Sequence, residues 1–432
     1  MDWLSFGLLL NDNIGLYLWS LLGSAILYFL VFRRMILSIL DPIVFSIIFS
    51  SFGFSVVIFL YFTHSIESKY LINYILTQLA FIGGFFTFKQ LKKDKIVAPY
   101  QTIVFEGEKL FLRITFFVCS LLYIIIQLIS YKVIGVPLLL GTHIDLYNNA
   151  GGWGVLGRII DVFKPLSIFL LIYFLFEKST SSLLYVYKYF FLVILIVFFA
   201  LSGSRSEFML LGFILFCYIM LNGSELKKYF TGIRKYEVIL LGFGMCFVFF
   251  TIVFQKNSGD ADAGSSIGIF LFRLVASGDV YYFAYPNNNI EHINHSQPFL
   301  ALFGDIFYTL RIIPRNNQPV VIGFQLFNMF GVSDTIAGPN ARHNVFGYIY
   351  YGFWGSIVFS YLVGLFLSFT RNNLFFILRK NKLGQALFTL LYLQITVIET
   401  DPPMVVSNLE TLFLMLSLLF VICISSFILI KS

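Results

Sequence analysis

Six arginines lie where the sequence brings charge close to long apolar runs, and their chemistry gives the first indication of function. An arginine side chain stays protonated in a protein, and its planar fork of N–H donors grips a phosphate through two parallel hydrogen bonds. Arg205 is the most unusual, because it occupies the short turn "SGSRSE" between two apolar runs, where Glu207 could hold its fork. The alternative is that Arg205 only reaches out to the membrane surface. The six arginines, which together predict a site for an anion such as a diphosphate, are Arg158, Arg205, Arg273, Arg311, Arg315 and Arg342.

A histidine stands directly beside the last of these arginines. His343 follows Arg342 where an apolar run begins, and a histidine titrates near pH 6.5, so it can act as a general base. We expect His343 to take this role. The alternative is that His343 only caps the helix that follows it, in which case Asp279 and Asp401 are the candidate bases.

Several other kinds of chemistry leave no pattern in the sequence. It contains no paired-cysteine or His-x-x-x-His motif, no glycine-rich phosphate loop and no Gly-x-Ser-x-Gly turn, so we expect no metal and no other cofactor. The cysteines lie inside apolar runs, where a small buried side chain is the ordinary interpretation. The many aromatic residues beside the arginines suit sugar rings, and apolar walls suit an isoprenoid tail. These features predict a site for a sugar linked to a lipid diphosphate, and no nucleic-acid partner.

A membrane-embedded framework must position these residues. Hydrophobic residues make up 59% of the 432-residue chain and charged residues only 12%, whereas a soluble chain has about 25% charged residues. Apolar runs close to the length that crosses a bilayer predict an all-α polytopic membrane protein, a single domain over 1–432 with eleven helices. No signal-peptide pattern precedes the first run, so we expect it to be retained. The expected spans are 14–32, 42–63, 70–88, 112–133, 164–177, 184–202, 207–222, 237–254, 345–369, 384–398 and 409–430.

Charge in the links between these spans predicts the orientation. Alternate links are rich in lysine, as in "KQLKKDK" and "ELKKYFTGIRK", and such links stay on the cytoplasmic side. The N-terminus is then outside the cytoplasm and the C-terminus inside it, and all five histidines and the arginines named above fall on the outer side. The spans themselves are nearly free of charge.

The largest outer segment is the loop 255–344, which is too long to be a plain connection. Apolar stretches at 266–285 and 298–315 predict interfacial or re-entrant helices, so we expect this loop to form a lid over a site. The alternative is a loop that only dips an apolar face into lipid. The loop ends before the span at 345–369, whose first N–H groups would face the outer leaflet and favour an anion. Close backbone packing against another span is predicted by Gly347, Gly352, Gly355 and Gly364.

Two stretches carry a resemblance to a known family. "SGSRSEF" after an apolar run, followed by a large outer loop and "GPNARHNVFGYIYYGFWG", is similar to the Wzy-type O-antigen polymerases of bacteria. The resemblance covers most of the chain as a layout, but only these two stretches as motifs. The family belongs to a GT-C-like group of metal-independent glycosyltransferases that also contains the O-antigen ligases. The resemblance implies a role in lipopolysaccharide biosynthesis, in the inner membrane of a bacterium.

The resemblance also implies a mechanism at the periplasmic face. The donor is a glycan on undecaprenyl diphosphate, the acceptor is a second lipid-linked repeat unit, and undecaprenyl diphosphate is the leaving group. Fixed arginines stabilise the charge that develops on it. A chain-length regulator protein is a candidate partner, besides the membrane lipids. The residues implied are Arg205, Arg273, Arg342 and His343 for catalysis, and position alone adds Arg311, Arg315, Asp279 and Glu207 for substrate binding.

Two other functions compete with polymerisation. An O-antigen ligase would use the same donor with a lipid A-core acceptor, and the motifs do not separate it from a polymerase. A transporter or flippase of lipid-linked oligosaccharides should carry charged residues within its spans and an internal repeat. The sequence shows neither feature, which favours an enzyme.

Overall fold

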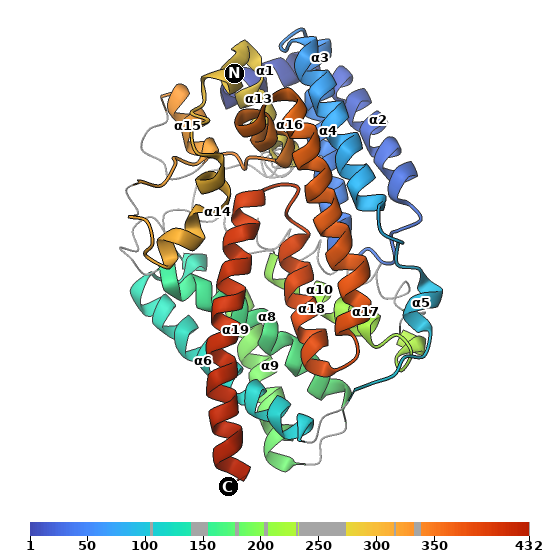
Figure 1. Cartoon of the computed structure of the whole chain (residues 1–432), viewed down its shortest axis with the longest axis vertical. Coiled ribbons are helices and arrows are strands. Elements are labelled where there is room, and N and C mark those ends of the chain that lie inside the picture. The colour runs from blue at the N-terminus through green and yellow to red at the C-terminus, as the bar shows by residue number, and fades with distance from the viewer. Residues whose placement is uncertain are drawn as a thin grey trace.

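The computed structural model describes residues 1–103, 107–139, 154–177, 181–202, 206–229, 232, 274–314, 317–331 and 338–431. All regular structure in these residues is helical, so the prediction of an all-α fold is confirmed. The described residues contain seven helices that are long and apolar enough to cross a membrane. The two ends of the chain lie at opposite ends of the molecule (Figure 1).

Every expected span within the described residues coincides with a helix. The span expected at 237–254 lies outside them, so the count of eleven stays a prediction. Two of the helices, with 16 and 14 residues, are shorter than the roughly 20 residues that cross a bilayer. The helices are α2 (Ile14–Phe32), α3 (Pro42–Phe62), α4 (Ser68–Phe86), α6 (Glu108–Val133), α8 (Gly154–Phe176), α9 (Ser182–Ser202), α10 (Ser206–Leu221), α16 (His343–Ser368), α18 (Lys382–Ile395) and α19 (Pro402–Lys431).

The fifth expected span, at 164–177, was placed too late in the chain. Helix α8 begins at Gly154, so residues that we expected in an outer loop belong to the helix. The start of this helix was missed because the charge of Lys164 interrupts the apolar run. In the structure its Nζ lies 2.7 Å from Oε1 of Glu207 on α10, and both side chains are mostly buried. An ion pair between two helices therefore allows the helix to carry the charge inside the protein.

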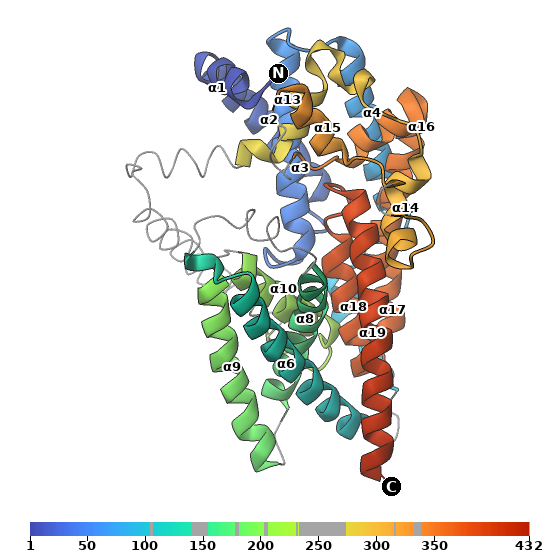
Figure 2. The ribbon, with the colours of Figure 1, turned by 90° about the vertical axis from the view of Figure 1, so that its left-hand side faces the viewer.

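The helices form two main groups, each around its own hydrophobic core. Helices α6, α8, α9 and α10 pack together with α18 and α19, towards the end of the molecule where the C-terminus lies (Figure 2). Helices α3 and α4 pack with α1 (Trp3–Asp12), α13 (Asp279–Ala284) and the first part of α16. The link between α18 and α19 lies at the upper ends of these two helices (Figure 1), and Thr396, Ile398 and Glu399 on it are buried.

Helix α16 is not one straight rod. At Gly352 the backbone adopts φ +69° and ψ −172°, a conformation that is essentially restricted to glycine. The chain reverses there, because Nδ1 of His343 lies 2.8 Å from Oγ of Ser360, whereas residues 343 and 360 would be about 25 Å apart along a continuous helix. The piece 343–351 therefore packs back against the piece 353–368.

This reversal corrects the expected position of Arg342 and His343. We expected them at the mouth of a span, near the membrane surface. Ser360 lies about 12 Å along the helix from the reversal at Gly352, and His343 contacts Ser360. Arg342 and His343 consequently lie in the protein interior, away from the turn at Gly352.

Close packing of two glycines joins α16 to α4. A Cβ added at Gly84 would lie 2.1 Å from the carbonyl oxygen of Tyr361, and one added at Gly364 would lie 2.0 Å from that of Phe81. Glycine lets the two backbones touch, as small residues do in membrane helix pairs. The predicted role of Gly364 is thus confirmed, whereas Gly355 faces only Tyr351 of its own chain segment.

The described part of the long loop differs from the two interfacial helices that we expected. Of the stretch 266–285, residues 274–285 are described, and they include η2 (Ala276–Gly278) and the six-residue α13. All residues from Val280 to Tyr285 are buried in the core with α3. The second stretch is helix α14 (Pro298–Thr309), which ends earlier than expected and contacts α19. Helices η3 (Pro286–His292) and α15 (Ile322–Met329) complete this layer. Aromatic residues on successive positions of α13 explain its burial, since they leave no polar face.

Candidate functional site

Arg342 lies at the centre of a buried polar cluster. Its side chain is 2% exposed, and its Nη1 donates to Oε1 of Glu399, which is 1% exposed, over 3.1 Å. Its Nη2 donates to the carbonyl oxygen of Phe49 on α3 over 3.0 Å. An ion pair at this depth costs desolvation, which is offset only when further hydrogen bonds satisfy both partners.

Helix α3 supplies those further bonds to Glu399. Oε2 of Glu399 accepts a hydrogen bond from Oγ of Ser46 over 3.2 Å and another from Oγ of Ser50. The two serines are four residues apart, so they lie on one face of α3, one turn above the other. The carboxylate is thereby held from three directions, and it fixes the guanidinium of Arg342.

His343 is an internal residue with a defined set of contacts. Its side chain is fully buried, its ring stacks on Phe81 with centroids 5.1 Å apart, and its Nε2 lies 3.4 Å from Nε2 of Gln78. Its backbone N–H donates to the carbonyl oxygen of Glu399 over 3.1 Å. We expected this helix N-terminus to offer its first N–H groups to an anion, and that expectation is wrong for the N–H of His343.

Asp279 lies close enough to this cluster for the charge of Arg342 to act on its carboxylate. Burial raises its pKa from the ordinary value to about 7, against a hydrogen bond from the N–H of Val280 and the field of the Arg342 guanidinium, which both lower it. Tyr281, two residues further, donates from its hydroxyl to Oδ1 of Asn344 over 3.0 Å. The structure therefore places Asp279 in the same region as Arg342 and His343.

A second carboxylate lines a hollow of about 330 Å³ next to this cluster. Asp401 precedes α19, and the hollow is also lined by Ala341, Asn340 and Tyr350 from the segment around Arg342. Burial raises the pKa of Asp401 to about 6, although the N–H of Met404 donates to the carboxylate. A carboxylate with this pKa can accept a proton near neutral pH and release it again.

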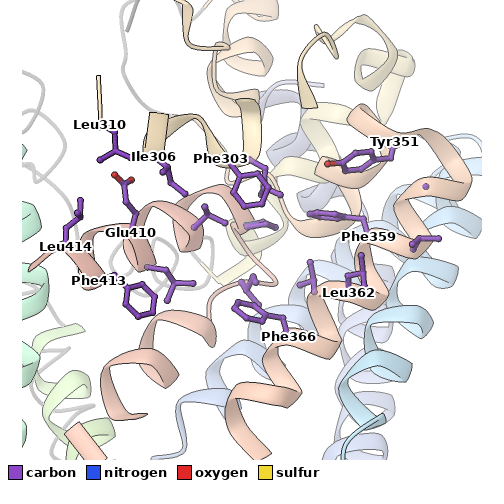
Figure 3. Close-up of a pocket in the computed structure, with 18 residues that line it drawn as sticks. Phe303, Ile306, Leu310, Tyr351, Phe359, Leu362, Phe366, Glu410, Phe413 and Leu414 are labelled. Carbon is purple, nitrogen blue, oxygen red and sulfur yellow. The ribbon is translucent and has the colours of Figure 1, made fainter. Parts of the chain in front are cut away.

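A larger apolar groove of about 1070 Å³ adjoins that hollow. It runs between α14, α16 and α19, where Phe303, Phe359 and Phe413 face it (Figure 3). Glu410 is the one charged side chain among the described residues that line it. The groove and the hollow are lined by consecutive residues on each side, namely Ala301 and Leu302, Tyr350 and Tyr351, and Asp401 and Pro402. An apolar chain in the groove would thus place its polar end beside Asp401.

The other predicted site residues are placed elsewhere or are not described. Arg205, Arg273 and Arg315 lie outside the described residues. Arg311 is exposed after the end of α14, with φ +55°. Glu207, which we expected to hold the fork of Arg205, has Lys164 on its Oε1.

Two charged residues at the centre of buried networks were missed by the sequence analysis. Glu399 was not among the candidate residues, although it precedes the candidate base Asp401 by two positions. Arg371, two residues beyond the expected span 345–369, was not a candidate either. In the structure it is fully buried, and its Nη2 lies 2.9 Å from Oδ2 of Asp41 while Tyr392 contacts the same carboxylate. The helix widens to a π-helix at Phe369–Leu374 around this arginine, a distortion that is common at functional sites.

Comparison of the chain with protein-family models, with curated proteins and with solved structures finds no match to any of them.

Proposed function

We propose that this protein is a glycosyltransferase that polymerises oligosaccharide repeat units carried on undecaprenyl diphosphate, at the outer face of a bacterial inner membrane. One observation carries the proposal: an apolar groove of about 1070 Å³ adjoins a smaller hollow that is lined by the carboxylate Asp401 and by Asn340. A substrate with a long hydrocarbon tail and a sugar head needs these two surfaces side by side. The buried ion pair of Arg342 with Glu399 lies beside the hollow, because Ala341 lines it.

The proposed reaction exchanges one carbon–oxygen bond for another and transfers one proton. A hydroxyl oxygen of the acceptor bonds to the anomeric carbon of the donor sugar, and the bond from that carbon to the diphosphate oxygen breaks. The electron pair leaves with undecaprenyl diphosphate, and the hydroxyl proton passes to a base. Asp401 is now our first choice for this base, because His343 is fully buried and already contacts Ser360. Arginines stabilise the departing diphosphate, and Arg205 and Arg273 remain our candidates.

The pKa of Asp401 predicts a pH dependence. A base must be ionised, and burial holds this carboxyl protonated until about pH 6. Chain growth in membrane vesicles should therefore rise between pH 5 and pH 7 with a midpoint near 6, and Asp401→Asn should lose about 10²-fold or more of the rate. A pH profile in Asp401→Asn with the wild-type midpoint would assign the base elsewhere, first to Asp279.

The same pKa also affects folding stability. Because the pKa of Asp401 is raised in the folded protein, its contribution to stability is complete below the pKa of the unfolded chain and is lost as pH rises through 6.

The arginine in the "SGSRSE" turn gives a separate prediction. Arg205→Lys keeps the positive charge but loses the planar fork, so chain growth should fall about 10²–10³-fold, the range for losing one group that stabilises a developing anion. Quantitative blots should show an unchanged protein level. Arg33→Lys, in a link that needs only positive charge, is the matched control and should grow chains of normal length. Normal chains in Arg205→Lys would exclude the proposed contact with diphosphate.

The proposal is tested by the lipopolysaccharide of a strain from which the gene is deleted. A single repeat unit on the core supports the polymerase, because the ligation step then survives. A core without any repeat unit supports the ligase instead. Complementation with wild type and with Asp401→Asn shows whether the missing step depends on the proposed site.

A transporter of lipid-linked oligosaccharides is the second candidate. Two observations support it more strongly than the sequence does. The expected spans are nearly free of charge. Arg342 and Arg371, on either side of the span 345–369, are nevertheless both buried in ion pairs within the helix bundle. Helix α16 is also interrupted at Gly352, as helices in transporters are. Movement of a fluorescent undecaprenyl-diphosphate-linked sugar across liposomes that contain the purified protein would support this candidate, whereas conversion of that substrate to longer chains supports the enzyme.

A further inference from the structure

A third hollow, of about 350 Å³, lies next to the one that contains Asp401. It is formed by the segment before α14, the segment before α15 and α15 itself, in the layer at the upper left of Figure 1. None of the described residues that line it is charged. Its polar lining consists of Ser296 and six amide side chains, namely Asn294, Gln297, Asn317, Gln318, Gln325 and Asn328.

Part of this lining is held in place by the protein itself. Gln325 donates from Nε2 to the carbonyl oxygen of Val320 over 2.7 Å and accepts at Oε1 from the N–H of Asn294 over 2.9 Å. Gln318 donates to Oδ1 of Asp305 over 3.1 Å. These bonds join the three segments into one wall, so the hollow has a defined shape.

Other amides of the lining remain open to a ligand. The side chains of Gln297, Asn317 and Asn328 make no hydrogen bond to any residue that the structure describes. A side-chain amide offers an oxygen that accepts and an NH₂ group that donates. A sugar offers neighbouring hydroxyl or acetamido groups that do both, whereas a charged ligand would find no opposite charge here.

The amide hollow is a neighbour of the Asp401 hollow, because Pro319 and Val320 line both. We propose that the amide hollow binds an uncharged sugar residue of the glycan whose reacting end lies at Asp401. This inference rests on the proposed function and narrows its substrate to glycans with a neutral sugar near the reacting end.

The test measures binding of free oligosaccharides, so that it does not depend on transfer. The purified full-length protein in detergent is titrated, with saturation-transfer NMR as the readout, with tetrasaccharides of glucose, of N-acetylglucosamine and of galacturonic acid. The variant Asn317→Ala with Asn328→Ala removes two open amides. Asn11→Ala, an exposed amide on α1 far along the chain from the hollow, is the matched control, and thermal unfolding checks that all variants are folded.

We expect the wild type and Asn11→Ala to bind at least one neutral tetrasaccharide, and to bind the acidic one at least tenfold more weakly. The double variant should bind the neutral one about tenfold more weakly. Equal binding by the double variant, tighter binding of the acidic tetrasaccharide, or no binding of either neutral one would overturn the inference. If binding behaves as expected but the membranes extend no chains, the proposed polymerase fails while the sugar site stands.

Discussion

Glu399→Gln should unfold the protein at a clearly lower temperature than wild type and abolish its activity. The substitution keeps the shape of the side chain, but it leaves one acceptor oxygen where Ser46, Ser50 and Arg342 donate to two, and it removes the charge that balances Arg342. A buried arginine without its partner costs about 3–5 kcal/mol. The measurement is thermal unfolding in detergent by intrinsic fluorescence, together with the fraction of protein that elutes as a single species.

Two further variants separate a structural cause from a functional one. Removing both charges, by Glu399→Gln with Arg342→Met, should recover most of the lost stability, because replacing a buried pair with apolar groups is often neutral. The double variant should still grow no chains if Arg342 faces the leaving diphosphate. Glu67→Gln, at a carboxylate with 55% of its side chain exposed beside Lys69, should change stability by less than about 0.5 kcal/mol. A single variant Glu399→Gln as stable as wild type would contradict the buried pair.

Gly84→Ala and Gly83→Ala should have opposite effects, although they are neighbours on α4. A methyl group at Gly84 meets the carbonyl oxygen of Tyr361 at 2.1 Å, and backbone atoms of α16 cannot turn aside as a flexible side chain can. Separating α4 from α16 should cost about 3 kcal/mol or more, at or beyond the upper end of the range for overpacking. At Gly83 a methyl group has nothing within 4 Å, and alanine favours a helix over glycine by about 1 kcal/mol.

The same unfolding measurement, made on both variants at one detergent concentration, tests this pair. We expect a midpoint several degrees below wild type for Gly84→Ala and an unchanged or higher midpoint for Gly83→Ala. Gly364→Ala, on the opposite side of the contact, should resemble Gly84→Ala, because its methyl group meets the carbonyl oxygen of Phe81. Equal midpoints for Gly83→Ala and Gly84→Ala would show that the two helices do not touch along this line.

Activity in the same variants connects this packing to the site. Helix α4 carries Gln78 and Phe81, which contact the ring of His343, and α16 carries His343 and Ser360. A shift between the helices would therefore move His343 and, through the backbone, Arg342. We expect the chain growth that remains in Gly84→Ala to fall further than its amount of folded protein, whereas Gly83→Ala should keep wild-type chain growth.

The positions of the helices were determined by the sequence itself. Whether a run such as 14–32 or 42–63 forms a helix depends on the apolar character and length of that run alone, and both helices appear within one or two residues of the expected bounds. The largest exception is α8, where the Lys164 charge interrupts the apolar signal and its partner, Glu207, is 43 residues away. Helix α19 also begins earlier than its expected span 409–430, at Pro402. Local composition cannot show that a distant residue neutralises a charge.

Which residues come together in the candidate site was decided by tertiary structure, because the contacts join residues that are distant in the chain. The sequence placed Arg342, His343 and Asp279 among the candidate residues, because their chemistry can be read from their types. It gave no sign that Glu399, 57 positions from Arg342, would neutralise that arginine. It also ranked Asp401 below His343, because burial and the apolar groove arise only when α14, α16 and α19 come together.

The turn at Gly352 could not be predicted from the sequence alone. It is one of four glycines at 347, 352, 355 and 364, and the sequence treats all four alike. Only at Gly352 does the backbone turn to φ +69°. The chain reverses there because the piece 343–351 packs back on residues around Ser356 and Ser360. The glycine permits this turn, but contacts between segments that are distant in the chain select it, and they set the depth at which Arg342 and His343 lie.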